Sequence, residues 1–358
     1  MLSPEVSRRG RVVSPPRPRR GSRHVTTFEP AEPTTRVPAR VTVQFQQMAS
    51  YLVTGGAGFI GSHLAEALVG RGESVRVVES FITGKRQNLE AVADAIELIE
   101  GDLAEPDVAK QAVAGVDYVL HQAAIPSVPR SVADPMTSHR ANVDATLQLL
   151  LAARDSGVKR IVYAGSSSAY GDAPTLPKRE DMPTAPLSPY ALQKLIGEQY
   201  MQMFTTLYDL ETVTIRYFNV FGPRQDPSSP YSGVIALFAT ALLAGKPVTI
   251  VGDGEQTRDF TYVSNIVDGV LRAVTAPEAS GEVINVATSQ QISINELATT
   301  LGNVIGTSLP PVHTDARVGD VRHSLADIGK AKALLGYEPE VGLEEGLRRT
   351  IDWYRRQS

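Results

Sequence analysis

Hydrophobic and polar positions follow two different periods along most of the chain. Short runs rich in β-branched residues predict strands at 50–54, 74–79, 96–100, 118–121 and 160–164. Between these runs, apolar residues recur at helical spacing, first in the stretch that begins at Phe59 and again over 141–153. Strands that alternate with helices form βαβ units, so the pattern predicts an α/β fold with a doubly wound parallel sheet.

The predicted elements fall into two stretches of different texture. Residues 48–220 carry the strand–helix alternation and predict one large α/β domain, to which a segment near 258–288 is expected to return. Residues 221–358 are rich in turns, with two helical patterns at 295–305 and 343–355. They predict a smaller C-terminal α/β domain, built onto the first.

The first 47 residues differ from the rest of the chain. Residues 1–47 hold nine arginines, no lysine and seven prolines, without apolar periodicity, which predicts a disordered basic tail. A transit peptide, a nucleic-acid-binding arm or an overlong start before Met48 are the alternative interpretations. The net charge of -4 divides into +6 for this tail, where three glutamates oppose the nine arginines, and -10 for the remainder. An acidic body disfavours nucleic acid as its partner.

Composition excludes several kinds of chemistry. Of the 358 residues, 42% are hydrophobic and 21% are charged, which is typical of a globular protein with a sizeable core. Cysteine is absent, which excludes disulfides, thiolate nucleophiles and cysteine-based zinc sites. The six histidines show no metal-ligand spacing, so we expect no metal. The longest apolar run, 234–244, is far shorter than the ~20 residues of a membrane helix, so we expect no membrane partner.

Three glycines, Gly55, Gly58 and Gly61, follow the first predicted strand and open the helix after it. Small residues there permit a tight turn and let backbone N–H groups approach a pyrophosphate, as in Rossmann dinucleotide sites. Glu79 ends the next strand, 24 positions after Gly55, where a carboxylate binds ribose hydroxyls and repels a 2′-phosphate. Together these residues predict NAD as the cofactor, although each alone also fits a simple turn or a solvated charge. Asp102, after the third strand, is either an adenine contact or a helix N-cap.

Tyr190 and Lys194 lie four residues apart at the start of a predicted helix, so their side chains leave from one face. A neighbouring ammonium is expected to lower the pKa of Tyr190 from about 10, which makes this residue a candidate base. The strand at 160–164 delivers Gly165 and the three serines after it to the carboxyl edge of the sheet, where a hydroxyl can hold a substrate oxygen. The alternative is a tyrosine that lies over a lysine on a helix surface. The turn GSSSAYG lacks the G-x-S-x-G pattern of a serine hydrolase.

These residues stand in an ordered series of motifs between Ser50 and Tyr354: GGAGFIGSHL, GDL, HQAA, SSSAYG, SPYALQK, RYFNVFGPRQDP, GDGEQTRDFTYV and RVGDVRHSLADIGKAKALLGYEP. The series resembles the extended short-chain dehydrogenase/reductase superfamily and, within it, the UDP-hexose 4-epimerases. The resemblance implies a Rossmann domain for NAD, a C-terminal domain mainly for the UDP-sugar, and 4-epimerisation through a transient 4-keto sugar. It also implies a homodimer formed through the Asn142 and Tyr190 helices, a cytoplasmic location and a role in polysaccharide biosynthesis.

Carried over position by position, the resemblance implies roles for individual residues. Tyr190 is the catalytic base and acid, Lys194 tunes its pKa, and Ser166 positions the reacting hydroxyl. The implied NAD contacts are Gly55, Gly58, Phe59, Ile60, Gly61, Glu79, Asp102, Leu103, Gln122, Ala123, Ala124, Asn142, Tyr190, Lys194 and Tyr217. The implied UDP-sugar contacts are Ser127, Ser166, Ser167, Asn219, Gly233, Val234, Arg258, Arg317, Asp320 and Ser324. Two arginines suit a diphosphate, because guanidinium groups pair bidentately with phosphate oxygens.

The resemblance also separates related reactions and substrates. Sister families that remove water or carbon dioxide carry carboxylates where this chain has Ser167 and Ser168, which favours epimerisation. Small residues at Ser324 and Gly233 leave room for an acetamido group, which favours UDP-N-acetylglucosamine/UDP-N-acetylgalactosamine, with UDP-glucose/UDP-galactose as a further pair. Pro126 departs from this pattern, because glycine is usual there. The alternatives are a UDP-glucuronate 4-epimerase, a 4-ketoreductase or a non-catalytic NAD-binding protein.

Overall fold

The computed structural model of the protein describes residues 48–227, 233–315 and 321–357, which belong to one compact unit. The basic tail predicted at 1–47 lies outside the described residues, and so do Arg317 and Asp320. None of the helices in these three ranges is long and apolar enough to cross a membrane.

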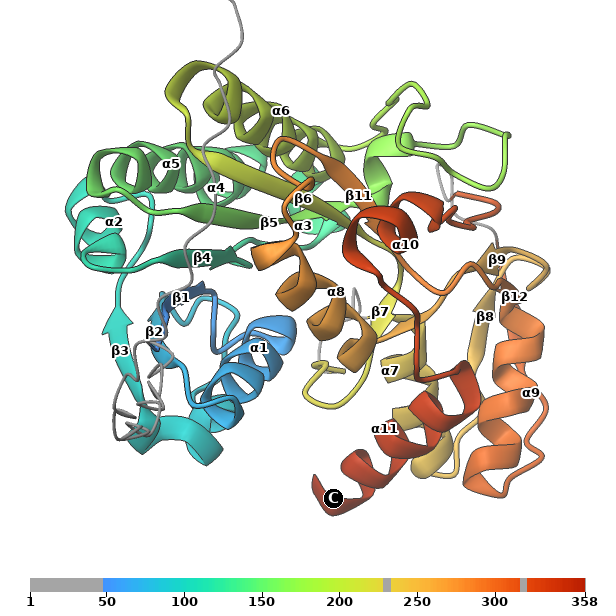
Figure 1. Cartoon of the computed structure of the whole chain (residues 1–358). Coiled ribbons are helices and arrows are strands. Elements are labelled where there is room, and N and C mark those ends of the chain that lie inside the picture. The colour runs from blue at the N-terminus through green and yellow to red at the C-terminus, as the bar shows by residue number, and fades with distance from the viewer. Residues whose placement is uncertain (1–47, 228–232, 316–320, 358) are drawn as a thin grey trace, which may run out of the picture. The chain divides into compact units, whose positions relative to one another are not determined.

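A parallel sheet of seven strands forms the centre of the fold, in the order β11-β6-β5-β4-β1-β2-β3 (Figure 1). Its strands are β1 (Ser50–Thr54), β2 (Ser74–Glu79), β3 (Ile96–Glu100), β4 (Tyr118–His121), β5 (Arg160–Ser166), β6 (Glu211–Tyr217) and β11 (Val283–Val286). The five predicted strands all occur, and β5 continues to Ser166, which pairs with Tyr217 at the end of β6. The strand order reverses between β1 and β4. Sheets of this kind bind ligands at such a point, beyond the carboxyl ends of the strands.

Helices cover both faces of this sheet (Figure 1). The helices α1 (Phe59–Gly70) and α8 (Val263–Thr275) lie on one face, and α2 (Pro106–Val113), α5 (Ala145–Ser156) and α6 (Pro189–Tyr208) lie on the other. Alternate residues of a strand point to opposite faces, so Val53 packs with α1 and α8 while Leu52 packs with the other three. The single helix expected at 141–153 is interrupted: a π-helical turn, η2 (Arg140–Asp144), precedes α5.

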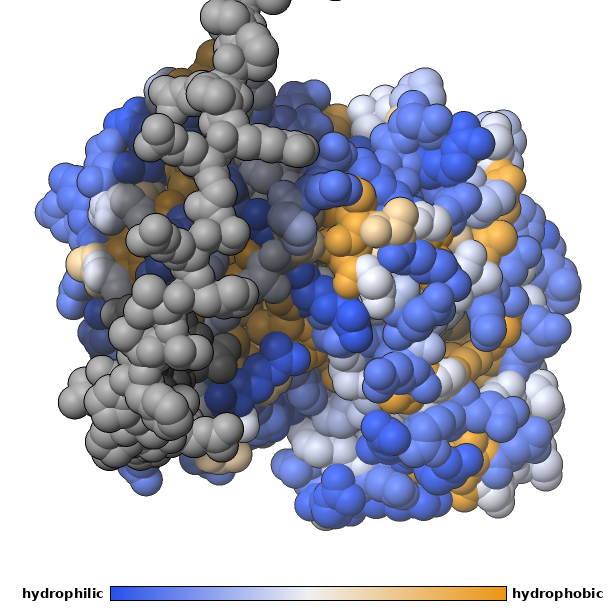
Figure 2. All heavy atoms as spheres, in the orientation of Figure 1, coloured by the Kyte–Doolittle hydropathy of each residue, from blue (hydrophilic) through white to orange (hydrophobic). Residues whose placement is uncertain are grey.

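A third hydrophobic cluster organises the C-terminal part, between α7 (Val234–Leu243), α9 (Ile294–Ile305) and α11 (Leu343–Gln357). Helices α9 and α11 confirm the two helical patterns in this part of the sequence. Apolar side chains of α11 face the cluster, whereas its outer face is charged, and Figure 2 shows mainly hydrophilic side chains over it. The strand β11 pairs with β6 and α8 packs against α1, so this later segment contributes to the large sheet. The division into two domains stays a prediction.

Short elements connect these layers. The helical ones are η1 (Arg86–Ala95), α3 (Val128–Ala133), α4 (Pro135–His139), η3 (Ser167–Tyr170) and α10 (Gly329–Leu335). The short strands are β7 (Val220–Phe221), β8 (Thr249–Val251), β9 (Thr257–Arg258), β10 (Thr261–Tyr262), β12 (Ile292–Ser293) and β13 (Val312–Thr314). They pair as β7 with β10, β8 with β13, and β9 with β12.

Candidate active site

A cavity of about 1000 Å³ opens beyond the carboxyl ends of the central strands. This volume is at the upper end of the range for small-molecule sites. Most of the residues that the sequence assigns to a site line this cavity. They are Gly55, Gly58, Phe59, Ile60, Gly61, Glu79, Asp102, Leu103, Gln122, Ala123, Ala124, Ser127, Ser166, Ser167, Tyr190, Lys194, Tyr217, Asn219, Gly233, Arg258 and Ser324. The fold therefore brings together residues that are up to 269 positions apart in the sequence, from Gly55 to Ser324.

The glycine turn after β1 is shaped so that only glycine fits. Gly55 has a positive φ of 65°, and a Cβ there would lie 2.8 Å from the backbone of Ala123. A Cβ at Gly61 would collide with the carbonyl oxygen of Gly55, so α1 packs directly on the turn. The N-cap of α1, Gly58, offers no side-chain cap, and its first turn holds no acidic residue. The free N–H groups at the N-terminus of α1 and the positive end of the helix dipole can therefore bind an anion, as a pyrophosphate site requires.

Glu79 lies at the end of β2, buried beside the glycine turn. One carboxylate oxygen accepts hydrogen bonds from the N–H groups of Ser80 and Phe81, both at 3.0 Å, and the other accepts from Ala57 N at 3.1 Å. Burial raises the pKa of Glu79, and these three bonds oppose the rise. A carboxylate has about four acceptor sites, so one remains for a ribose hydroxyl.

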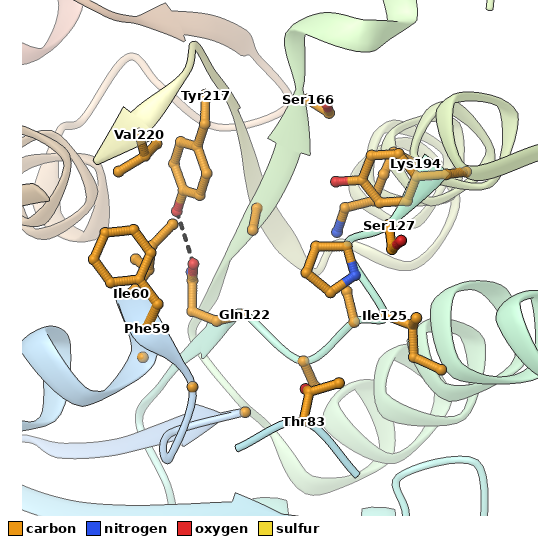
Figure 3. A pocket seen from close by; sticks show the side chains of 18 of the residues that line it. Phe59, Ile60, Thr83, Gln122, Ile125, Ser127, Ser166, Lys194, Tyr217 and Val220 are labelled. Carbon is orange, nitrogen blue, oxygen red and sulfur yellow. Dashed lines mark hydrogen bonds between the residues drawn. The ribbon is translucent and has the colours of Figure 1, made fainter. Parts of the chain in front are cut away.

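The amide of Gln122 lies in the cavity wall on the same side as Phe59 and Ile60 (Figure 3). The hydroxyl of Tyr217 donates a hydrogen bond of 3.0 Å to Gln122 Oε1. The other end of this amide, Gln122 Nε2, is buried and has no hydrogen-bond partner within the described residues. A buried donor without a partner is costly, so this nitrogen is suited to an acceptor on a bound ligand.

Tyr190 and Lys194 stand in the first two turns of α6, and Ser166 at the end of β5 forms a hydrogen bond with Tyr190. Figure 3 shows Ser166 and Lys194 in the cavity. The helix begins here because Ser188 Oγ accepts a hydrogen bond from Ala191 N at 3.2 Å and Pro189 occupies the first turn. Lys194 is 4% exposed, whereas Tyr190 lies half-buried in the cavity wall. The arrangement places a phenol, an ammonium and a hydroxyl at one point of the cavity.

The electrostatics of the pair differ from the sequence-based expectation. Burial raises the pKa of Tyr190 to about 12, and a hydrogen bond with Ser166 opposes the rise. Burial also lowers the pKa of Lys194 to about 7. The expected lowering of the Tyr190 pKa by Lys194 is therefore not found, because burial is the largest cause of the shift and Lys194 is not among the groups that act on this phenol. The lysine ammonium lies over the ring of Tyr163, 4.6 Å from its centroid.

Known proteins match this chain along most of its length. The NAD dependent epimerase/dehydratase family matches residues 51–287. The UDP-glucose 4-epimerase of Mycolicibacterium smegmatis is 40% identical over 311 residues, which cover 86% of this chain and 99% of the relative. A UDP-N-acetylglucosamine 4-epimerase from Methanobrevibacter ruminantium, solved with UDP-N-acetylmuramic acid, is 39% identical with a TM-score of 0.84, covering 87% of this chain and 99% of that one. A UDP-glucose 4-epimerase from Thermotoga maritima, solved with UDP-glucose, is 37% identical with a TM-score of 0.82, covering 86% and 99%.

The chain belongs to the NAD-dependent epimerase/dehydratase family. The predictions of the superfamily, the Rossmann-type α/β fold, an epimerase enzyme and NAD as cofactor are confirmed. The site fits NAD, because the glycine turn admits backbone close to a pyrophosphate, the uncapped α1 terminus favours an anion and Glu79 keeps one acceptor.

The charges around the cavity suit the ligands of this family. Among the described residues that line it, six are basic and three are acidic. The basic ones are Lys85, Arg130, Lys178, Lys194, Arg224 and Arg258, and the acidic ones are Glu79, Asp102 and Asp226. A basic cavity in a protein whose described part is mainly acidic attracts phosphate-bearing ligands. Within the described residues, no cluster of three or more histidine, aspartate or glutamate side chains is arranged to hold a metal ion.

Two predicted contacts do not reach the cavity wall. Asn142 is buried in η2, where its Oδ1 accepts from Ile125 N at 2.7 Å and its Nδ2 donates to Gln193 Oε1 at 2.9 Å. It therefore fixes the loop after β4 to α6 and is not itself a lining residue, because its amide is used within the protein. Val234, the first residue of α7, is also absent from the described lining, although Gly233 before it is present.

Three of the residues predicted to contact the substrate lie near the short β9 strand. Asn219 adopts a positive φ of 34° and donates through Nδ2 to the carbonyl of Asp259 at 3.1 Å. Arg258 Nη1 donates to the carbonyl of Thr257 at 2.9 Å, and Ser324 N donates to the same residue's carbonyl at 3.1 Å. These bonds hold Arg258 and Ser324 close together in the cavity lining, and their roles in substrate binding stay predictions.

Sequence reasoning missed a buried polar chain beneath the cavity. Thr54 Oγ1 accepts from the N–H groups of Gln122 and Ala123, so its own proton goes to His121 Nδ1, 2.7 Å away. The proton on His121 Nε2 then goes to Thr146 Oγ1 at 3.0 Å, whose proton goes to the carbonyl of Asn142 at 2.7 Å. Burial, with Lys194 nearby, lowers the pKa of His121 to about 3, so the ring is neutral. The motif HQAA contains this histidine, and polar residues at the ends of otherwise apolar strands were the signal.

Proposed function

We propose that the protein catalyses the NAD-dependent 4-epimerisation of a UDP-hexose, chiefly the interconversion of UDP-N-acetylglucosamine and UDP-N-acetylgalactosamine. The observation that carries the proposal is the convergence of Tyr190, Lys194 and Ser166 in the same cavity as the glycine turn. The names of the relatives and solved structures support a UDP-sugar as the substrate.

The residues of the chain supply the proton chemistry. When bound, NAD accepts a hydride from a sugar carbon and returns it. Tyr190 takes the proton of the 4-hydroxyl as the 4-keto sugar forms and gives it back afterwards. Ser166 holds the same sugar oxygen beside Tyr190. The reactive phenolate and ammonium together carry as many protons as a neutral phenol and amine, so the pair reaches this form by internal proton transfer.

The position of the acidic side chains supports epimerisation over elimination. Elimination of water or loss of carbon dioxide in the sister families uses a carboxylate beside the reacting sugar. Each of the three acidic residues in the described lining has partners within the protein. Glu79 holds the loop after β2, Asp226 pairs with Lys85 at 3.1 Å, and Asp102 accepts from Ala104 N at 2.9 Å. The residues that follow Ser166 are Ser167 and Ser168, and Ser166 Oγ bonds to Ser168 Oγ at 2.8 Å. No carboxylate within the described lining directly follows Ser166 along the chain.

The small residues Ser324 and Gly233 support an acetylated sugar, because they line the wall without filling it. Pro126, which stands where glycine is usual in the epimerases that this chain resembles, also lines the cavity. UDP-glucose is the second candidate substrate, favoured by the complex of the Thermotoga maritima structure with this ligand.

The test is a panel of UDP-sugars incubated with the purified enzyme without added reductant. We expect UDP-N-acetylglucosamine to yield a mixture with UDP-N-acetylgalactosamine, and Tyr190→Phe to abolish it. Ser324→Tyr should suppress acetylated substrates more than UDP-glucose, whereas Ser324→Ala should spare both. Absence of interconversion of every UDP-hexose overturns the reaction, and equal losses on both sugars with Ser324→Tyr overturn the pocket argument.

We also propose a homodimer formed through α6 and its neighbours. Large apolar side chains are exposed there, among them Met203 at 50% and Leu207 at 62% on α6, and Met136 at 76% on α4. Contiguous exposed apolar surface commonly marks a protein interface. A cytoplasmic location and a role in polysaccharide biosynthesis stay predictions from the family resemblance.

A further inference from the structure

Lys178 is a buried cation in the wall of the cavity that the chemistry above does not use. The residue is 3% exposed and lies on the connection between η3 and α6. Its ammonium donates a hydrogen bond to the carbonyl of Ala173. Asp172 attracts the ammonium electrostatically, but within the described residues no carboxylate approaches it closely enough for an ion pair. An ammonium carries three N–H donors, so two of them have no hydrogen-bond acceptor in the described part of the chain.

The backbone around Lys178 is fixed from two sides. Its N–H donates to the carbonyl of Leu325 at 2.7 Å, and its carbonyl accepts from Asp327 N at 2.9 Å and from Asn285 Nδ2 at 3.0 Å. These bonds form a parallel bridge between Lys178 and Ala326. These bonds fix the point from which the side chain leaves the main chain, and the bond from its ammonium to Ala173 holds its other end.

The position of Lys178 assigns it to one end of the cavity. The connection that carries it runs from η3 to α6, and Lys178 lines the same cavity as Ser166 and Tyr190 at its two ends. Ser324, whose neighbour Leu325 accepts the Lys178 N–H, lines the same wall. A buried ammonium with a single neutral acceptor is costly unless a ligand supplies further acceptors. The hexose is the part of a nucleotide sugar that must reach the reaction centre, and its oxygens are such acceptors.

We propose that Lys178 is a substrate-binding residue whose ammonium donates hydrogen bonds to an oxygen of the hexosyl group. The proposal rests on the proposed function, since it takes a UDP-hexose as the ligand. The oxygen is a hydroxyl, an acetamido carbonyl or a uronate carboxylate, and three UDP-sugars distinguish these sources. The opposing interpretation is that the lysine only ties its connection to the carbonyl of Ala173.

The test compares Lys178→Met with Lys332→Met in the NAD-loaded enzyme. Lys332 pairs with Glu338 at the surface of α10, so its loss controls for removal of one positive charge. The measurements are kcat/KM for UDP-N-acetylglucosamine, UDP-glucose and UDP-glucuronate, and the affinity for UDP by calorimetry. We expect Lys178→Met to lose at least tenfold in kcat/KM on one or more sugars while the affinity for UDP stays within threefold. Lys332→Met should stay within threefold in every measurement.

The outcomes separate binding from a structural role. A loss confined to UDP-N-acetylglucosamine assigns the acetamido carbonyl, a loss confined to UDP-glucuronate assigns the carboxylate, and a shared loss assigns a hydroxyl. Values within threefold on all three sugars overturn the proposal, and so does an equal loss of affinity for UDP. If Lys178→Met does not fold, Lys178→Gln, which keeps N–H donors without the charge, is measured in the same way.

A failure of the proposed reaction gives a different result. If the wild-type enzyme epimerises none of these sugars, the proposed function is wrong. The affinity of each UDP-hexose relative to UDP, measured in the wild type and in Lys178→Met, then still tests the contact. A ratio that is the same in both proteins overturns the role of Lys178 whatever the reaction.

Discussion

Tyr163 is expected to control the charge of Lys194 through its ring. The residue is fully buried in β5, with the ammonium of Lys194 4.6 Å from its ring centroid and the ring of His121 at 5.5 Å. Its hydroxyl makes only a long hydrogen bond of 3.4 Å to the carbonyl of Lys194. Gly197, one turn after Lys194, leaves the space that this hydroxyl fills. The ammonium of Lys194 and the ring of Tyr163 therefore form a buried cation–π pair.

The size of the expected pKa shift follows from the burial of Lys194 and Tyr163. A cation over an aromatic ring gains about 2 kcal/mol when it is desolvated, as Lys194 is. One pKa unit corresponds to about 1.4 kcal/mol, so Tyr163→Leu should lower the pKa of Lys194 by roughly 1.5. The other titratable groups near the ammonium are Tyr190, neutral His121 and Glu198, and the last pairs with Arg216 at 2.6 Å. The substitution changes none of these directly.

The assay is the pH dependence of kcat. Activity requires the pair of Tyr190 and Lys194 to lose one proton from its phenol–ammonium form, so kcat rises with pH through the first apparent pKa of the pair. With Tyr163→Leu this rise should move acidward by roughly 1.5 pH units. The plateau should fall by about 30-fold, because the phenolate–ammonium form becomes correspondingly rarer. Tyr163→Phe, which keeps the ring, should leave both quantities close to wild type.

A folded Tyr163→Leu enzyme with a pH profile that superimposes on the wild-type profile would refute this reasoning. Circular dichroism is needed alongside, since a large-to-small core substitution costs roughly 2 to 5 kcal/mol. A fall in kcat without an acidward shift would also contradict it, because the two effects have one cause.

Three further predictions concern stability and assembly. Arg216→Met should lower the free energy of unfolding by about 3 to 5 kcal/mol by leaving Glu198 buried without its partner, and Arg216→Met with Glu198→Leu should recover most of the loss in urea denaturation. The pKa of His121 is about 3 in the fold against 6.5 unfolded, so unfolded chains bind more protons below pH 6.5 and stability falls with falling pH. Between pH 7 and 4.5 the wild type should lose about 2 to 3 kcal/mol more than His121→Gln, and equal losses would exclude this source. Met203→Glu and Leu207→Glu should yield monomers by light scattering, whereas a monomeric wild type would exclude the dimer.

The sequence predicts a strand or helix correctly where a few consecutive residues show by their apolar character that the element is buried. The runs at 50–54 and 118–121 are apolar because helices cover both faces of the sheet. The strand β6, Glu211–Tyr217, was not predicted, because its threonines and charged ends resemble a surface segment. The structure buries them: Thr212 and Thr214 are 1% exposed, and Arg216 is neutralised by Glu198 from α6. Such a partner cannot be read from the strand itself.

The active site also combines features that a short stretch of sequence predicts with features that depend on tertiary contacts. The glycine turn and the Tyr190–Lys194 pair are local patterns, with spacing that determines which atoms share a face. The direction of the Asn142 side chain, which is not in the described lining, depends on the π-helical turn, and this turn has no sequence signature here. Tyr163 and Lys178 gave no signal either. Their significance depends on contacts with Lys194 and with the cavity that only the tertiary fold creates.

The burial that raises the pKa of Tyr190 suits one kind of reaction better than others. Net oxidation or decarboxylation changes the number of protons on the substrate, so a base in such an enzyme must exchange protons with water. Epimerisation removes a proton from the 4-hydroxyl and returns it to the same oxygen, so the base regains its proton within each cycle. A phenol four residues from a buried lysine can therefore complete each cycle without giving its proton to solvent, and the burial of the lysine strengthens the interaction of its ammonium with the phenolate in the reactive form. The desolvation that makes Tyr190 a weak acid without a ligand thus favours a reaction that returns the proton to the sugar oxygen from which it came.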